Sequence, residues 1–128
     1  PYTSVNDVEV KKIMNKFRFD ATVQAIVAFN KRLYPEYTDL VYWPIGREMA
    51  VHSDAYYPDG SPGKYVHRYC GGVLYLNDNF DGGCTIVGNE KVTPKTGDLI
   101  LFTGKDILHG VEEVTKGTRY TITSWYKK

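Results

Sequence analysis

Cysteine is scarce in this sequence: Cys70 and Cys84 are the only two in 128 residues. Two cysteines cannot form the disulfide framework that holds small secreted domains together, which excludes that class of protein. One disulfide between them is an alternative. Free thiols in a reducing compartment are favoured, and this indicates a cytoplasmic protein.

Charge of one sign and long hydrophobic runs are also missing. The 16 basic and 15 acidic residues leave a formal net charge of +1. This balance gives no electrostatic reason to expect a nucleic acid partner. No apolar run approaches the roughly 20 residues of a membrane-spanning helix, and no secretory signal is recognisable. We therefore expect no membrane partner. The sequence leaves the oligomeric state open, with a monomer favoured.

The first third of the chain has helical spacing. Asn6 or Asp7 can cap a helix in which apolar residues recur every three or four positions, and Asp20 can cap a second. Pro35 would end the second helix just after Tyr34. The pattern predicts two helices over about 6–34 that pack against a sheet.

The period changes from Asp39 onward, where short β-like runs alternate with turn signals rich in glycine, asparagine and proline. Eleven tyrosines suit a β-rich fold. We expect strands near 39–43, 48–53, 66–76, 84–88, 90–93, 98–102, 109–114 and 118–126. These runs predict a mainly β protein: a double-stranded β-helix (a cupin-like jelly roll) with the two helices on its major sheet. Residues 1–128 would form one domain, with the jelly-roll core at about 39–126.

A candidate metal site begins at His52-Ser53-Asp54. Alternate residues of an extended chain share a face, so His52 and Asp54 can present an imidazole nitrogen and a carboxylate oxygen to one point. His109 follows 57 residues later at the start of another β-like run. Two histidines and one carboxylate form the facial triad typical of non-haem Fe(II) oxygenases. Taken singly, His109 would be a structural histidine and Asp54 a turn residue.

Arg119 lies in the segment TRYTITSW, where alternation puts Arg119, Thr121 and Thr123 on one face. An arginine that points into a barrel needs an anion there, because an unpaired buried charge is costly. The alternatives are that Arg119 faces water or pairs with a carboxylate such as Asp98.

Several segments occur in the order found in one known family. They are Arg68–Asp78 (RYCGGVLYLND), Gly82–Thr85 (GGCT), Pro94–Phe102 (PKTGDLILF), His109 with Val114, and Gly117 with Arg119 and Trp125. Together with His52 and Asp54 they resemble the motifs of Fe(II)- and 2-oxoglutarate-dependent dioxygenases of the prolyl 4-hydroxylase type. The resemblance covers roughly residues 40–126. One departure is Gly71, where many members have threonine; the glycine removes a hydroxyl from the cosubstrate pocket or leaves room for something larger.

The resemblance implies that His52, Asp54 and His109 bind Fe(II) and are the catalytic centre. Arg119 would bind the 5-carboxylate of 2-oxoglutarate, with Tyr42 and Tyr75 beside it. The reaction would consume O2 and release succinate and CO2, with ascorbate as a reductant. Residues expected to contact the substrate are Arg68, Trp125, Tyr56, Tyr57 and Tyr65, the tyrosines lying in or next to a loop over the metal.

The resemblance favours a proline-containing peptide or protein as the substrate. The same cofactors could instead serve a lysyl side chain, a free amino acid or a nucleobase. A different class of function is a metal-binding or catalytically silent jelly-roll module that serves as a binding domain. The intact set of His52, Asp54, His109 and Arg119 argues against the silent module.

Overall fold

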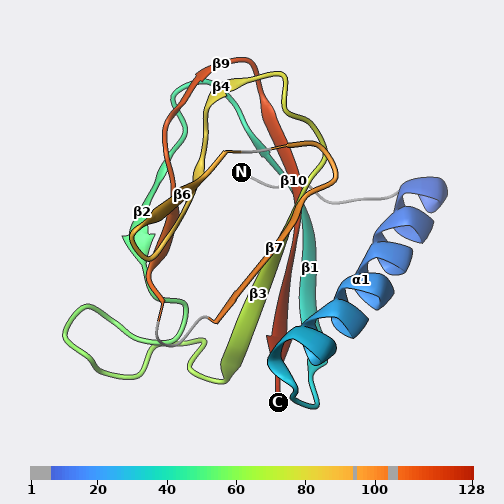
Figure 1. Cartoon of the computed structure of the whole chain (residues 1–128), viewed down its shortest axis with the longest axis vertical. Coiled ribbons are helices and arrows are strands. Elements are labelled where there is room, and N and C mark those ends of the chain that lie inside the picture. Colours follow the sequence, from blue (N-terminus) through green and yellow to red (C-terminus); the bar gives the residue numbers. More distant parts are fainter. Residues whose placement is uncertain (1–6, 94, 104–106) are drawn as a thin grey trace.

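The computed structural model describes residues 7–93, 95–103 and 107–128 and shows two antiparallel sheets that face each other, with one helix outside the larger sheet (Figure 1). The larger sheet has the strand order β1-β10-β3-β7 and the smaller has β2-β8-β5-β6, while β4 pairs with β9. The elements of the described chain are α1 (Val8–Phe29), β1 (Tyr34–Trp43), β2 (Met49–His52), β3 (Arg68–Tyr75), β4 (Asp81–Gly82), β5 (Thr85–Val87), β6 (Glu90–Val92), β7 (Leu99–Thr103), β8 (His109–Val111), β9 (Val114–Lys116) and β10 (Arg119–Lys127).

The prediction of two helices is wrong, because the described chain has one continuous helix, α1. Asp7 caps it by accepting a hydrogen bond from the Val10 amide at 3.0 Å. Asp20 caps nothing; it lies inside the helix and pairs with Lys16 one turn earlier, at 2.9 Å. The helix ends at Asn30, whose left-handed φ of 52° closes its last turn.

The predicted end of the helical region at Tyr34 is also wrong, because β1 already begins there. Pro35 lies in this strand and not at a helix end. The position tolerates proline because β1 is an edge strand, and the register with β10 shifts between Pro35 and Tyr37.

Seven of the eight predicted strands match one strand each, within a few residues except at β1, which starts five residues before the predicted Asp39. The predicted run 109–114 is two strands, β8 and β9. β4 was missed because it has two residues and both occur in the turn-like segment DNFDGG.

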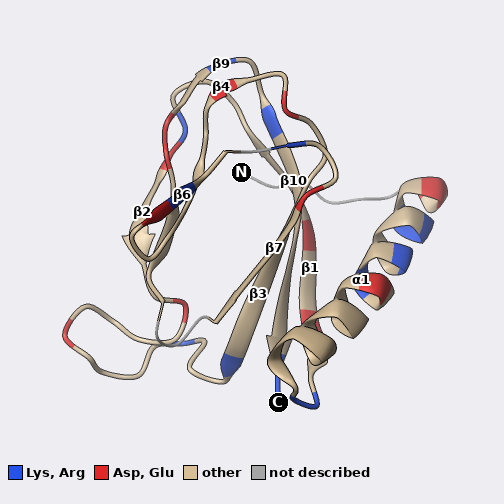
Figure 2. Cartoon of the chain, in the orientation of Figure 1, with Lys and Arg blue, Asp and Glu red and all other residues tan. Residues whose placement is uncertain are grey.

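Alternation in β10 and β3 separates two layers of side chains. Small residues of α1, Ala21 and Ala25, pack with Cys70 and Tyr126 on the outer face of the larger sheet. Because these side chains are small, the helix can approach the strands closely, and no residue of α1 beyond Asp20 is charged (Figure 2). Both cysteines are free, as predicted, and burial raises the pKa of Cys70 to about 12. No helix among the described residues could span a membrane.

Candidate functional site

The three predicted metal ligands converge between the two sheets. His52 ends β2 and His109 begins β8, and the two residues are direct partners in the sheet register. Asp54 lies in the bend just after β2 and not on the strand itself. One ligand atom from each residue lies within 4.8 Å of the other two, so a single ion could contact all three.

Asp54 holds the centre of this group. Its Oδ1 lies 3.5 Å from Nε2 of His52 and 3.4 Å from Nε2 of His109. Burial alone would raise the pKa of Asp54, but the hydrogen bonds and charges of His109 and His52 hold it well below its ordinary value. Its second oxygen is buried without a hydrogen-bond partner in the described chain. An ionised, under-coordinated carboxylate between two imidazoles is suited to binding a cation.

Neighbouring groups fix the orientation of the ligands. Nδ1 of His52 lies 2.9 Å from the Ala50 carbonyl, which leaves Nε2 facing Asp54. The ring of His109 packs against Phe102 with a centroid distance of 4.4 Å. The Ser53 hydroxyl accepts hydrogen bonds from the amides of Ala55 and Tyr56, which holds the bend that carries Asp54.

Arg119 lies inside the barrel, as predicted, with an exposed fraction of 2%. Its guanidinium donates to the Gly83 carbonyl at 3.0 Å, to Oγ1 of Thr85 at 3.1 Å and to the Tyr75 hydroxyl at 3.5 Å. Asp98 is exposed, so the alternative pairing is not formed. No ion pair to Arg119 occurs among the described residues. A buried guanidinium with only neutral partners is suited to binding an anion.

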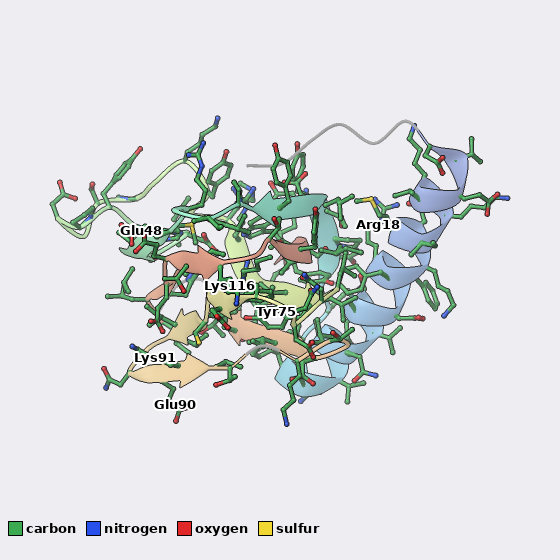
Figure 3. All side chains as sticks on the ribbon, turned by 90° about the horizontal axis from the view of Figure 1, so that it is seen from above. Arg18, Glu48, Tyr75, Glu90, Lys91 and Lys116 are labelled. Carbon is green, nitrogen blue, oxygen red and sulfur yellow. The ribbon has the colours of Figure 1, made fainter. Side chains whose placement is uncertain are left out.

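Tyr75 and Thr85 complete this anchor. Tyr75 lies in the interior, in contrast to Arg18 and Glu90 at the outer edge (Figure 3). Its hydroxyl is hydrogen-bonded to that of Thr85. Thr85 was not among the predicted site residues, although it belongs to the GGCT motif.

The two glycines before Thr85 shape the backbone that binds Arg119. Gly82 and Gly83 have φ angles of 72° and 65°, in the left-handed region that favours glycine. A Cβ on Gly82 would also overlap the Glu113 carbonyl, and a Cβ on Gly83 would lie 3.1 Å from Cδ of Arg119.

Gly82→Ala is therefore expected to lower the free energy of unfolding by about 2 kcal/mol or more, because backbone strain and overlap add. Urea unfolding monitored by circular dichroism measures this loss. Gly60→Ala is the matched control: its φ is 86°, but nothing lies within 4 Å of an added Cβ. A cost for Gly82→Ala no larger than the control's would contradict the predicted overlap.

A cavity of about 260 Å³ connects the three ligands with Arg119. The larger sheet supplies Arg119, Thr123 and Trp125 from β10. The smaller sheet contributes the ligand histidines. The apolar part of the wall consists of Val41, Trp43, Met49, Val73, Phe102 and Val111. The cavity is thus mostly apolar, with a few charged groups at defined places.

The structure places three of the predicted substrate contacts together. The Arg68 guanidinium lies between two aromatic rings, 3.7 Å from the centroid of Tyr65 and 4.7 Å from that of Trp125. Its Nε is 3.5 Å from Glu36, which is also hydrogen-bonded to His67 at 2.6 Å. Trp125 lines the cavity, whereas Arg68 and Tyr65 are not among its lining residues.

Three of the tyrosines predicted to contact the cosubstrate or substrate do not line the cavity. Tyr42 is 41% exposed and lies outside the cavity, whose wall is formed by its strand neighbours Val41 and Trp43. Trp43 faces Arg119 at 5.7 Å, so Trp43 takes the place expected for Tyr42. Tyr56 and Tyr57 are also absent from the cavity wall, and their loop extends away from the sheets (Figure 1).

The position of Phe102 decides whether Gly71 leaves room for a larger ligand. A Cβ at Gly71 would lie 3.2 Å from the ring of Phe102. Phe102 therefore fills the space next to Gly71, and no room for a larger ligand is left at this point.

A profile of the 2OG-Fe(II) oxygenase superfamily matches residues 37–127, which include every residue of this site. The chain belongs to the 2OG-Fe(II) oxygenase superfamily. It is 36% identical to prolyl 3-hydroxylase 3 of Homo sapiens over 73 residues, 51% of this chain but 10% of the relative. The chain thus spans a small part of that relative's length.

Solved structures of other superfamily members share the fold. A 2OG-Fe(II) oxygenase family oxidoreductase from Burkholderia pseudomallei is 19% identical, with a TM-score of 0.75 over 98% of this chain and 59% of that one. A Pseudomonas putida prolyl-4-hydroxylase is 25% identical, with a TM-score of 0.62 over 84% of this chain and 62% of that one. The jelly-roll prediction is confirmed.

The site fits the cofactors of this oxygenase superfamily. The donor set of two imidazoles and one carboxylate suits Fe(II), and the unpartnered oxygen of Asp54 leaves capacity for coordination. The cationic pocket of Arg119, Thr85 and Tyr75 suits the distal carboxylate of 2-oxoglutarate.

Proposed function

We propose that this oxygenase hydroxylates a proline residue in a peptide or protein, using Fe(II), 2-oxoglutarate and O2, with ascorbate as the reductant. The observation that supports the reaction is the single cavity that joins the His52–Asp54–His109 triad to buried Arg119. Support for proline comes from the names of similar proteins, a prolyl 3-hydroxylase and a prolyl-4-hydroxylase.

Each group has a separate task in this proposal. His52, Asp54 and His109 hold Fe(II), and Arg119 with Thr85 and Tyr75 orients 2-oxoglutarate. The bound cofactors supply the oxidant that inserts one oxygen atom of O2 into a C–H bond, while 2-oxoglutarate is converted to succinate and CO2. Protein side chains need not act as acid or base in the C–H step. The apolar wall, with Val73, Phe102 and Val111 among its members, keeps water from the reacting atoms.

The half-buried end of the cavity would receive the substrate. Trp125 offers a flat apolar surface for a pyrrolidine ring, and Arg68 can donate hydrogen bonds to peptide carbonyls. Arg68 is already held in place by Tyr65 and Glu36, so it loses little freedom on binding.

The test is succinate release from 2-oxoglutarate, measured with Fe(II) and ascorbate, with and without proline-rich peptides. We expect slow succinate formation without peptide and a several-fold increase with one peptide, which then gains 16 Da by mass spectrometry. Absence of both iron binding and succinate would support the silent module. Stimulation by a lysyl peptide or a nucleobase, and not by proline, would assign a different substrate.

A further inference from the structure

One charged residue of the cavity wall has no place in the cofactor site. The charged or ionisable groups that line the cavity are the three metal ligands, Arg119 and Asp39. Asp39 lies on β1 with Val41 and Trp43, and all three side chains face inward. The three metal ligands and Arg119 have assigned tasks. The carboxylate of Asp39 has none, so its position in the cavity wall remains to be explained.

Register places Asp39 far from the 2-oxoglutarate anchor. Trp43 is opposite Arg119 in the sheet, whereas Asp39 is opposite Thr123. Four residues along a strand correspond to about 13 Å. Arg119 is buried at one end of the cavity, and Asp39, Thr123 and Trp125 are only half-buried at the other. We call these three residues the cavity mouth.

Asp39 lacks a partner that would explain its position. Within the described chain its carboxylate makes no hydrogen bond and no ion pair. Burial raises its pKa, and the positive charge of Arg68 offsets this only in part. Arg68 itself pairs with Glu36 and is covered by Tyr65 and Trp125. A half-buried carboxylate that faces a cavity and has no bound counterion can form an ion pair with a cationic ligand that enters there.

We infer that Asp39 is a specificity-determining residue that selects substrates with a positively charged nitrogen near the reacting carbon. The inference rests on the proposed function, because it assumes that the substrate enters at the cavity mouth. The nitrogen could belong to a basic side chain beside the target proline or to a free α-ammonium group. Both would form a charge-assisted hydrogen bond with the carboxylate, while an acidic substrate would be repelled.

The substrate test uses blocked pentapeptides with a central proline flanked on both sides by lysine, glutamine or glutamate. A second set of substrates compares proline amide, which carries a free ammonium group, with N-acetylproline amide, which does not. Binding is followed by tryptophan fluorescence, since the only two tryptophans, Trp43 and Trp125, both line the cavity. Peptide-stimulated succinate release is measured in parallel.

For the unmodified protein we expect roughly tenfold tighter binding of the lysine peptide than of the glutamine peptide, with glutamate weakest. Asp39→Asn should bring the lysine and glutamine peptides to equal affinity, and Asp39→Lys should make the glutamate peptide the tightest. Asp39→Glu keeps the charge and should keep the order. Asp98→Asn, which removes an exposed carboxylate outside the cavity, is the matched control and should also keep it.

The two readouts separate the inference from the proposed function. Charge-dependent binding that Asp39→Asn removes would support the inference even if no peptide released succinate, in which case the proposed prolyl hydroxylation would fail. A preference for proline amide alone, lost in Asp39→Asn, would identify the nitrogen as an α-ammonium. Equal binding of all peptides, no binding of any, or a lysine preference that survives Asp39→Asn would overturn the inference.

Discussion

His109→Gln is expected to abolish Fe(II) binding and succinate release together. Loss of one imidazole leaves two ligands, too few to hold Fe(II) against water at micromolar concentration. Glutamine is chosen because His109 is 6% exposed and packs on Phe102, so truncation to alanine would add a cavity. The direct readout is anaerobic Fe(II) titration followed by thermal unfolding. Fe(II) at a free concentration of a hundred times its dissociation constant should raise the free energy of unfolding by about 2.7 kcal/mol, and the variant should show no such gain.

His67→Gln is the matched control for this experiment. His67 pairs with Glu36 and is not among the three residues that converge on one point. Its replacement should leave the Fe(II)-dependent rise in the unfolding temperature intact. Stoichiometric Fe(II) binding by His109→Gln, or loss of binding in His67→Gln, would contradict the assigned triad.

The metal site could be predicted because its signal is local and chemical. The pair His52 and Asp54 has a fixed separation, and β2 and β8 each place a histidine at the same point of their shared register. Alternation along β10 groups Arg119 with Thr121 and Thr123 on one face, and the resemblance to the family indicated that this face lies inside the barrel. A two-residue period assigns side chains to two faces but does not tell which face is inward.

Errors arose where tertiary context decides. Asp20 resembles a helix cap in sequence, but in the structure it continues α1 and pairs with Lys16. Tyr42 was expected beside Arg119 from the resemblance. A shift of one residue along a strand exchanges inward and outward faces, and Trp43 is the inward residue of β1.

Asp39 was not predicted as a site residue because the evidence for it is the lack of a hydrogen-bond or ion-pair partner for its carboxylate. On β1 an aspartate in the segment YTDLVYW reads as an ordinary polar residue at an edge strand. Only the register with Thr123 and the engagement of Arg68 by Glu36 show that the carboxylate faces the cavity without a partner. The sequence contains neither fact.

Arg119→Gln should raise the 2-oxoglutarate concentration needed for half-maximal succinate release by roughly a hundredfold, because removing one member of a buried charge pair costs about 3 kcal/mol or more. Glutamine can still donate to Gly83 or Thr85, which limits the structural damage. Arg119→Lys keeps the charge but loses the planar fork, so an intermediate increase is expected. Arg119 is 2% exposed, and burial lowers its pKa, so its interaction with an anion is little screened by water and the larger effect is favoured.

Iron binding distinguishes this loss from a general failure of the site. The Fe(II)-dependent rise in unfolding temperature should survive in Arg119→Gln, since Arg119 makes no contact with the three ligands among the hydrogen bonds of the described chain. Arg18→Gln, an exposed change on α1, is the control and should alter neither quantity. An unchanged 2-oxoglutarate requirement in Arg119→Gln would mean that another group holds the distal carboxylate. The buried guanidinium would then be stabilised by its neutral partners alone, which is energetically unfavourable for a buried charge.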